Sequence, residues 1–239
     1  MKPYQGEESK SEQIKTMFDN IAPTYDFLNH LLTFGIDKSW RKSLARELKK
    51  KGSKNIVDIA TGTGDLALTL ARKCTDSQIV GVDLSPKMIE FAKEKIAKKN
   101  LQNRITLLVE DVEKITFPDS GFDAATCAFG VRNFQNIESG LKSMARVIKP
   151  GGVIAILEFS TPKNKIFATF YRFYFHKFLP FVGGLFSKDR QAYKYLPESV
   201  DEFPNPEEFC KKMQNTGFES IRTKKLMCGV AYIYYGKKK

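Results

Sequence analysis

The sequence contains no long hydrophobic run and no closely spaced pair of cysteines. Its longest apolar stretch, residues 178–186, is about half the ~18 residues that a membrane-spanning helix needs, and the N-terminus is too polar for a secretion signal. The cysteines, Cys74, Cys127, Cys210 and Cys228, lie far apart. This spacing excludes a zinc ribbon and a CxxC redox motif built from local residues, so no metal site is expected. We expect a soluble, cytoplasmic protein with reduced thiols.

Length and composition are typical of a folded chain. Of the 239 residues, 42% are apolar and 28% are charged, which argues against a disordered, collagen-like or coiled-coil protein. We expect one domain over residues 1–239. Lys and Arg outnumber Asp and Glu by 39 to 27, and the net charge of +12 suits either nucleic acid or an anionic membrane surface. The location of the basic residues must decide between these two partners.

Apolar β-branched runs alternate with charged helical stretches from about residue 55 onward. This is the pattern of βαβ units and of a parallel sheet with helices on both faces, so the fold class is α/β. Strands are expected at residues 56–60, 79–83, 105–109, 124–129 and 153–159, and an antiparallel pair is expected within 218–235. Helices are expected at 66–73, 87–99 and 138–148, the last stopped by the Lys-Pro-Gly-Gly run at 149–152, and from Pro206 onward.

Two segments do not belong to this alternation, an N-terminal stretch at residues 1–51 and an insertion at residues 163–195. The insertion holds 11 of the 29 aromatic residues, and its seven basic residues and one acid supply +6 of the +12 net charge. Rings mixed with Lys and Arg suit a lipid interface or a greasy ligand. The alternative is a helical cap that buries its rings against the sheet, and both can be true. We expect an N-terminal helical cover and a basic-aromatic helical insertion that faces substrate or membrane.

A glycine-rich loop follows the first expected strand, in the run Asp-Ile-Ala-Thr-Gly-Thr-Gly-Asp at 58–65. Gly62 and Gly64 allow a tight strand-to-helix turn and a close approach of the backbone to a ligand. With Ala67 the loop also fits the GxGxxA pattern of dinucleotide-binding proteins, and Asp83 ends the second strand, where an acid can bind ribose hydroxyls. An NAD-dependent oxidoreductase is therefore one reading. Another is a loop that only makes a tight turn, with the acids as helix caps.

The acids around this loop favour a cationic ligand. Asp58, Asp83, Glu110 and Asp111 fall at or near the carboxyl ends of expected strands, where open α/β sheets bind ligands. Asp65 would lie in the first turn of the next helix, where it would repel a pyrophosphate. S-adenosylmethionine (SAM) carries a sulfonium and an ammonium but no phosphate. The sequence therefore predicts SAM rather than NAD.

Several motifs resemble those of one methyltransferase family. The run at 57–65, together with Gly-Val-Asp-Leu-Ser at 81–85, resembles the first two motifs of Rossmann-like methyltransferases. The run Arg-Val-Ile-Lys-Pro-Gly-Gly at 146–152, continuing to 157–160, resembles the second signature of the ubiquinone/menaquinone biosynthesis C-methyltransferases. Phe-Gly-Val-Arg-Asn at 129–133 is similar to the motif that follows their fourth strand.

The first signature of this family is also recognisable. It runs from Tyr25 to Trp40, with Leu28, Thr33 and Asp37 where Met, Ser and His are usual. The resemblance implies a class I methyltransferase fold with a mostly parallel seven-stranded sheet. It also implies SAM-dependent C-methylation of a prenylated quinol in respiratory quinone biosynthesis, with demethylmenaquinol as the preferred acceptor.

The resemblance implies particular cofactor contacts. Thr63, Asp83 and the Asp111-Val112 pair fall on the family's cofactor positions. Their chemistry agrees, because Thr63 offers an N–H and a hydroxyl, while the carboxylates can accept from ribose hydroxyls and the adenine amino group. The full set of residues expected around SAM is Asp58, Gly62, Thr63, Gly64, Asp83, Asp111 and Val112. For Asp83 and Asp111 the alternative role is that of a strand-end or helix cap.

Four residues are candidates for the acceptor side of the reaction. A phenolate pushes electron density onto the ring carbon that attacks the methyl group, so the site must orient the quinol, exclude water and favour the phenolate. Arg132 and Asn133 could hold the quinol oxygens, with Arg132 favoured, or they could form a strand-end salt bridge and turn. Tyr25 could donate a hydrogen bond to the quinol or be a buried ring. His176, inside the insertion, could act as a base or be structural.

The expected partners are a prenylated quinol and, transiently, an anionic membrane surface, at the inner face of the membrane. A homo-oligomer is left open. The isoprenoid tail could lie on the rings of the insertion, which include Phe167, Phe170, Tyr171, Phe173, Phe178, Phe181 and Phe186.

Other functions remain as alternatives. Methylation of a benzoquinol in the ubiquinone pathway is one, and a non-catalytic interaction domain is another. An RNA methyltransferase would suit the basic charge. However, no Asn/Asp-Pro-Pro-aromatic loop follows the fourth strand and the chain has no Pro-Cys dipeptide, so no nucleic-acid partner is expected.

Overall fold

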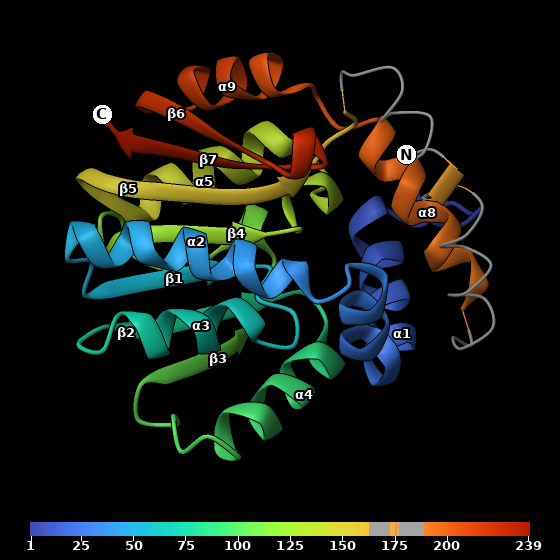
Figure 1. The fold of residues 1–239 in the computed structure, drawn as a ribbon, viewed down its shortest axis with the longest axis horizontal. Helices are drawn as coiled ribbons and strands as arrows, with labels where there is room; N and C mark the ends of the chain where they lie inside the picture. The colour runs from blue at the N-terminus through green and yellow to red at the C-terminus, as the bar shows by residue number, and fades with distance from the viewer. Residues whose placement is uncertain (163–172, 175, 177–188) are drawn as a thin grey trace.

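The computed structural model describes residues 1–162, 173, 174, 176 and 189–239. Its centre is a seven-stranded sheet of order β3-β2-β1-β4-β5-β7-β6 (Figure 1). The strands are β1 (Asn55–Ile59), β2 (Gln78–Asp83), β3 (Ile105–Val109), β4 (Phe122–Ala128), β5 (Ile148–Phe159), β6 (Phe218–Leu226) and β7 (Ala231–Lys238). The first five are parallel, whereas β7 runs antiparallel to both β5 and β6. This topology confirms the predicted α/β fold with a mostly parallel sheet and an antiparallel closing pair.

Helices precede, connect and follow these strands. They are α1 (Lys10–Leu32), α2 (Ile36–Lys51), α3 (Asp65–Lys73), α4 (Pro86–Ala97), α5 (Ile137–Val147), α8 (Arg190–Asp201) and α9 (Pro206–Asn215). Short 3-10 turns are η1 (Val112–Lys114), η2 (Val131–Asn133) and η4 (Met227–Gly229). Two helices begin with a side-chain cap followed by proline: Ser85 caps α4 and Asn205 caps α9.

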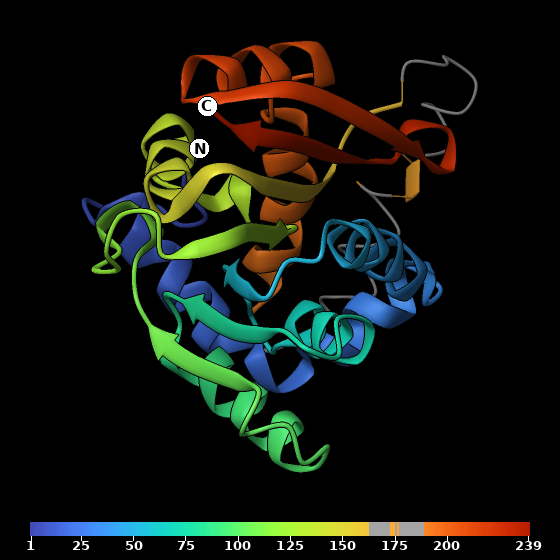
Figure 2. The same ribbon diagram turned by 90° about the vertical axis from the view of Figure 1, so that its left-hand side faces the viewer.

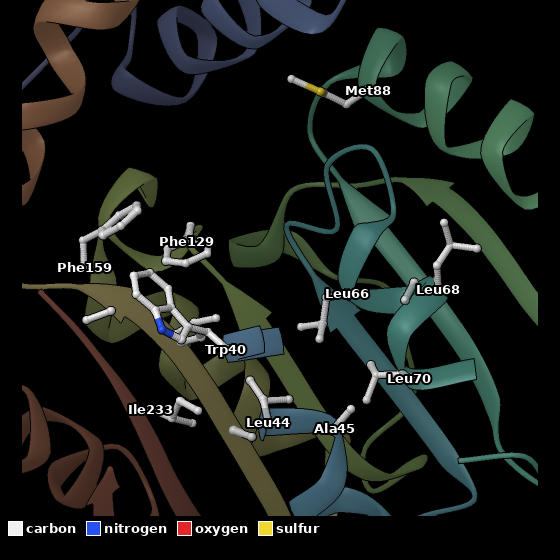
Figure 3. Packing of buried hydrophobic residues seen from close by; sticks show 14 of the residues in the cluster. Trp40, Leu44, Ala45, Leu66, Leu68, Leu70, Met88, Phe129, Phe159 and Ile233 are labelled. Carbon is white, nitrogen blue, oxygen red and sulfur yellow. The ribbon is translucent and has the colours of Figure 1, made fainter. Parts of the chain in front are cut away.

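Helices cover both faces of the sheet, with α2 and α3 on one side and α5 on the other (Figure 2). On the first side, Leu44 and Leu48 of α2 and Leu70 of α3 pack into one apolar cluster with residues of β1 and β5. Figure 3 shows the part of this cluster around Trp40, which lies against Phe129 and Phe159. On the other side, α5 and α9 pack into a second cluster with the opposite faces of the strands. Burial on both faces explains why most residues of the central strands β1 and β4 are apolar.

Helices α1 and α8 lie beside the carboxyl ends of the parallel strands (Figure 1). The ammonium group of Lys10 in α1 donates to the backbone carbonyls of Arg132, at 3.0 Å, and of Phe134, at 2.9 Å. These bonds fix the start of α1 against the loop that follows β4. The N-terminal stretch is therefore helical, as predicted, and it covers the edge of the sheet where α/β folds bind ligands.

Two local expectations are wrong. Strand β5 begins at Ile148 rather than at residue 153, because Ile148 pairs with Phe122 of β4 before the register shifts. The Lys-Pro-Gly-Gly run is therefore an irregular part of the strand, with Gly151 at a φ of +74°. Helix α8 takes in the end of the expected insertion and continues to Asp201.

Most of the aromatic residues expected to hold the isoprenoid tail lie outside the described residues. Of that set only Phe173 is described, and its side chain is exposed. Within the part of the chain that the structure describes, no helix is long and apolar enough to cross a membrane.

Candidate active site

The chain changes direction across the sheet between the neighbouring strands β1 and β4, which creates a crevice at their carboxyl ends. The residue after each strand has left-handed backbone angles, with a φ of +52° at Ala60 and +60° at Phe129. Each such conformation costs a non-glycine residue about 1–2 kcal/mol. At Gly130 a Cβ atom would lie 2.6 Å from the Cβ of Ala60 and 2.8 Å from the Sγ of Cys127, so only glycine fits. The two loops therefore pack as one strained unit at the crevice.

A first cavity, here called the loop cavity, opens beside the glycine loop. Gly62, Asp83, Asp111 and Val112 of the predicted cofactor set line it. The Asp83 carboxylate accepts hydrogen bonds from the backbone N–H groups of Gly62, at 2.8 Å, and Ser85, at 2.9 Å. Burial raises the pKa of Asp83 to about 6. Asp111 is also the cap of η1, so it combines the predicted contact position with its alternative structural role.

The groups that line the loop cavity suit a cationic nucleoside. Its charged residues are Asp83, Glu110 and Asp111 against a single Lys15, among the described residues. The N–H of Gly62, which a pyrophosphate would need, is already engaged by Asp83. The acids could accept from the hydroxyl and amino groups of an adenosine, and the negative potential favours a sulfonium. The side chains and backbone groups that line the loop cavity therefore fit SAM and not a dinucleotide.

Three other members of the predicted cofactor set are absent from the described lining of the loop cavity. Asp58 is buried beneath it and accepts from the hydroxyls of Thr61, at 2.7 Å, and Thr126, at 2.6 Å, which ties the loop to β4. Burial raises the pKa of Asp58 to about 6. The Thr63 hydroxyl accepts from Lys95 at 3.1 Å, on the side facing α1 and α4. Gly64 begins α3 with a φ of +79°. In this structure these residues shape the loop.

Asp65 belongs to a cluster of charges between α1, α2 and α4. Its carboxylate pairs with Lys95 at 2.5 Å, with Nε2 of His30 at 3.3 Å and with Arg41 at 3.8 Å. Burial opposes ionisation of Asp65, but Arg41 and Lys95 outweigh it and lower the pKa of the carboxyl group. The negative charge of Asp65 is thus compensated and lies outside the described cavity lining. Asp65 is therefore not the residue that makes the glycine loop unfavourable for a pyrophosphate. That effect comes from Asp83, which already accepts from the Gly62 N–H.

A second cavity, here called the acceptor cavity, has a volume of about 260 Å³. Its lining is mostly aromatic and aliphatic and comes from α1, α2, the loop after β4, the end of β5, and α8. Four residues line both cavities and form a shared wall: Phe18, Tyr25, Phe129 and Asn133. A ligand in the acceptor cavity would thus lie directly beside a ligand in the loop cavity.

Arg132 combines the two roles considered for it. It forms the strand-end salt bridge, with 2.8 Å between its Nη1 and Oε1 of the fully buried Glu158, and it also lines the acceptor cavity. The guanidinium lies 5.7 Å from the ring centroid of Phe159, and its Nε donates to the Ser199 hydroxyl at 3.3 Å. The carboxylate also accepts from the backbone N–H of Arg132 at 3.3 Å. Glu158 therefore fixes both the backbone and the side chain of Arg132.

The other predicted acceptor-side residues have different positions. Asn133 lies in the shared wall, where its side-chain oxygen accepts from the Tyr195 hydroxyl at 3.3 Å. Tyr25 is also in the shared wall, and burial raises the pKa of its hydroxyl. His176 pairs with Asp201 at 3.0 Å and is not among the described residues that line either cavity. The structure thus brings Arg132, Asn133 and Tyr25 together and leaves His176 apart.

A buried ion pair in the acceptor cavity was missed by the sequence analysis. Asp37 and Arg41 both line it, and the Arg41 guanidinium lies 5.5 Å from the ring centroid of Phe129. The Asp37 carboxylate is in contact with Arg41, and it accepts from the Thr33 hydroxyl at 2.8 Å. The spacing of four residues could have predicted the pair, since such residues are neighbours on a helix. Nothing local in the sequence shows that the pair faces a cavity.

Comparison with known proteins decides the family. The ubiE/COQ5 methyltransferase family matches residues 6–238. The chain belongs to this family. A ubiquinone/menaquinone biosynthesis C-methyltransferase UbiE from Geotalea daltonii is 48% identical over 230 residues, which cover 96% of this chain and 97% of the relative. A demethylmenaquinone methyltransferase from Bacteroides fragilis is 40% identical, over 100% of this chain and 97% of the relative.

Solved structures agree on the fold of this family member. The [4+2]-cyclase SpnF superposes with a TM-score of 0.69 at 15% identity, covering 95% of this chain and 96% of that one. A SAM-dependent methyltransferase from Thermotoga maritima, a possible histamine N-methyltransferase, gives 0.63 at 18% identity, covering 94% and 99%. At such identities these likenesses show the fold alone. Together with family membership, they confirm the predicted Rossmann-like fold and the prediction of a SAM-dependent methyltransferase.

Proposed function

We propose that this member of the ubiE/COQ5 family transfers a methyl group from SAM to a ring carbon of a prenylated quinol, converting demethylmenaquinol to menaquinol. The observation that carries the proposal is the shared wall between an acidic loop cavity and an aromatic acceptor cavity. Methyl transfer needs the donor and the acceptor carbon in contact and in line, with water excluded. The names of the full-length relatives, which refer to quinone biosynthesis, supply the acceptor class.

The loop cavity would bind the cofactor, which supplies an electrophilic methyl group when bound. Asp83 and Asp111 would accept from its ribose and adenine groups, while Gly62 and Val112 line its walls. Asp58, Thr63 and Gly64 would act by holding the loop in shape. Each assignment follows from the position of the residue around or below the cavity.

The acceptor cavity would bind the quinol ring between its aromatic side chains. Arg132 would stabilise the phenolate form, because a guanidinium next to the ring oxygen lowers the free energy of the anion in a site with little water. Asn133 and Tyr25, both in the shared wall, would orient the ring against the cofactor. The phenolate would form by loss of a hydroxyl proton, which is the one proton released for each methyl group transferred. After the ring carbon has received the methyl group, its own proton would move to the ring oxygen and restore the quinol. His176 has no position in this scheme.

The prenyl tail requires an apolar exit from the acceptor cavity. Phe34 and Met227 line this cavity and are 76% and 49% exposed, so its mouth presents apolar side chains to the surroundings. With the chain's excess of basic residues, this mouth suits brief contact with an anionic membrane surface at its inner, cytoplasmic face. Binding to vesicles that contain anionic lipid should fall as salt is raised. An absence of binding at every salt concentration would contradict the membrane contact and leave the enzyme activity unaffected.

The activity is tested by transfer of labelled methyl from SAM to a prenylated naphthoquinol, in parallel with a prenylated benzoquinol, with and without reductant. Label in the organic phase only with reductant would support quinol C-methylation and identify the accepted ring. No label on either ring, with SAM binding demonstrated by calorimetry, would refute the proposed acceptor.

A further inference from the structure

A buried carboxylate, Asp37, lines the acceptor cavity, and its position bears on whether the cavity binds a reduced or an oxidised ring. Among the described residues that line the cavity, Asp37 is the single carboxylate, against the cations Arg41 and Arg132. Its side chain is almost fully buried, and it lies in the first turn of α2. Neither the methyl transfer nor the cofactor site uses it.

Hydrogen-bond donors cannot distinguish a quinol from a quinone, because the oxygens of both molecules accept hydrogen bonds. The guanidinium groups of Arg41 and Arg132 could therefore bind either form. A hydrogen-bond acceptor can distinguish them, since a quinol hydroxyl donates a hydrogen bond to it and a quinone carbonyl cannot. A carboxylate facing a quinone carbonyl also places two electron-rich oxygens together, which is repulsive.

The surroundings of Asp37 keep it in the form that accepts. Its Oδ1 accepts from the Thr33 hydroxyl at 2.8 Å, and its Oδ2 lies 3.0 Å from Nδ1 of His30 and in contact with Arg41. Burial opposes ionisation of Asp37, but the Arg41 guanidinium and the Thr33 hydroxyl outweigh it and lower the pKa of the carboxyl group.

The named partners do not use every lone pair of the Asp37 carboxylate. A carboxylate offers about four lone-pair sites, and the three groups named above use three of them. The remaining acceptor site belongs to a side chain that lines the cavity.

We propose that Asp37 is a specificity-determining residue that accepts a hydrogen bond from a quinol hydroxyl and so makes the acceptor cavity select the reduced ring over the quinone. This proposal rests on the proposed function and names how the site discriminates within that substrate class. The oxidised form, which cannot be methylated, would then be kept from occupying the site as an inhibitor.

The first test compares ligands on the unmodified enzyme. Trp40 is the single tryptophan of the chain and lines the acceptor cavity, so its fluorescence reports occupancy. The probes are 1,4-dihydroxynaphthalene, kept reduced, and 1,4-naphthoquinone, with 1,4-dimethoxynaphthalene as a ligand that carries the oxygens but no donor. Equilibrium dialysis checks each dissociation constant. We expect the diol to bind about tenfold or more tighter than both other ligands, because an unpaired buried acceptor is costly. Equal binding of all three would overturn the proposal.

The second test uses the substitution Asp37→Asn with Asp65→Asn as the matched control. Both remove one negative charge from the same cluster, but Asp65 is not among the described residues that line the cavity. An amide can also donate, so D37N should bind the diol and the quinone within about threefold of each other, whereas D65N should keep the ratio of the unmodified enzyme. A wild-type ratio in a folded D37N protein would refute the role of Asp37.

These binding ratios are separate from the proposed function. If the unmodified enzyme methylates no prenylated quinol, the acceptor assignment fails whatever the ratios are. If it methylates the quinol and the ratio does not depend on Asp37, the assignment stands and the proposal for Asp37 is wrong.

Discussion

Removal of the Glu158 carboxylate should destabilise the protein far more than loss of an ordinary side chain. Glu158 is fully buried and holds the Arg132 guanidinium at 2.8 Å. Its carboxylate also accepts from the backbone N–H groups of Arg132, at 3.3 Å, and of Phe159, at 3.0 Å. The substitution Glu158→Ala leaves a buried cation and two buried N–H groups without this acceptor. Breaking such a pair costs about 3–5 kcal/mol of the free energy of unfolding.

A conservative variant tests whether charge or shape is responsible. Glu158→Gln keeps a side-chain oxygen for the N–H groups but removes the charge, so we expect a smaller loss of about 1–3 kcal/mol. Replacing both partners, in R132M/E158L, removes the buried charges together. It should recover much of the stability that E158A loses, because apolar side chains of similar volume avoid the desolvation of two ions.

Urea unfolding at neutral pH measures all three variants, with the slope of the unfolding curve checked for a constant value. If E158A lowered the free energy of unfolding by less than about 1 kcal/mol, the reasoning would be refuted, since a buried guanidinium without its carboxylate should destabilise the protein by more than that. The double variant supplies a further check. It should be stable but inactive in methyl transfer if Arg132 acts on the quinol, and an active double variant would contradict that role.

Three further predictions concern the cofactor side. Burial raises the pKa of Asp83 to about 6, so its carboxylate loses its charge as the pH falls below that value. The affinity for SAM, measured by calorimetry, should therefore decline between pH 7 and pH 5. An affinity that does not change with pH would contradict a contact by the ionised form. Gly130→Ala should lower the free energy of unfolding by about 1–3 kcal/mol, because its Cβ would lie 2.6 Å from the Cβ of Ala60; unchanged stability in urea would show that the two loops can separate. Lys95→Met leaves the partly buried carboxylates of Asp26 and Asp65 without the cation that they share, so the melting temperature should fall relative to the unmodified protein at neutral pH. The difference in melting temperature should be smaller near pH 4, and an equal difference at both pH values would point to lost packing instead.

The sequence predicted the elements whose signals are local. The strands that end at Asp83 and Val109 finish at the expected residues, because runs of apolar residues flanked by turn residues specify them directly. Helix α9 begins at Pro206 as predicted, and α4 begins at Pro86, one residue before the predicted start. Helix α8 was not separated from the insertion. Its sequence has Pro197 in the interior of the helix and tyrosines at 193 and 195, and these residues weaken the helical pattern.

Around the site, the sequence predicted which residues come near the crevice but not what each one contacts. The carboxyl ends of parallel strands meet at one edge, so Asp83 and Asp111 could be placed there from topology. Asp58 has the same pattern, yet its side chain points at Thr61 and Thr126, because the partners of a strand residue depend on the neighbouring strand. The pairing of Arg132 with Glu158 joins the 3-10 turn η2 to β5, 26 residues further along the chain, and has no local signal.

The shared wall between the two cavities links the binding of one ligand to the binding of the other. A ligand that moves Phe18, Tyr25, Phe129 or Asn133 changes the lining of both cavities at once. Thermodynamic linkage then requires reciprocity: the factor by which the methyl donor changes the affinity for the acceptor equals the factor by which the acceptor changes the affinity for the donor. On the proposed function, the spent cofactor would occupy the same cavity without the methyl group. Its contacts with these four side chains would therefore contribute to the affinity of the site for the methylated product.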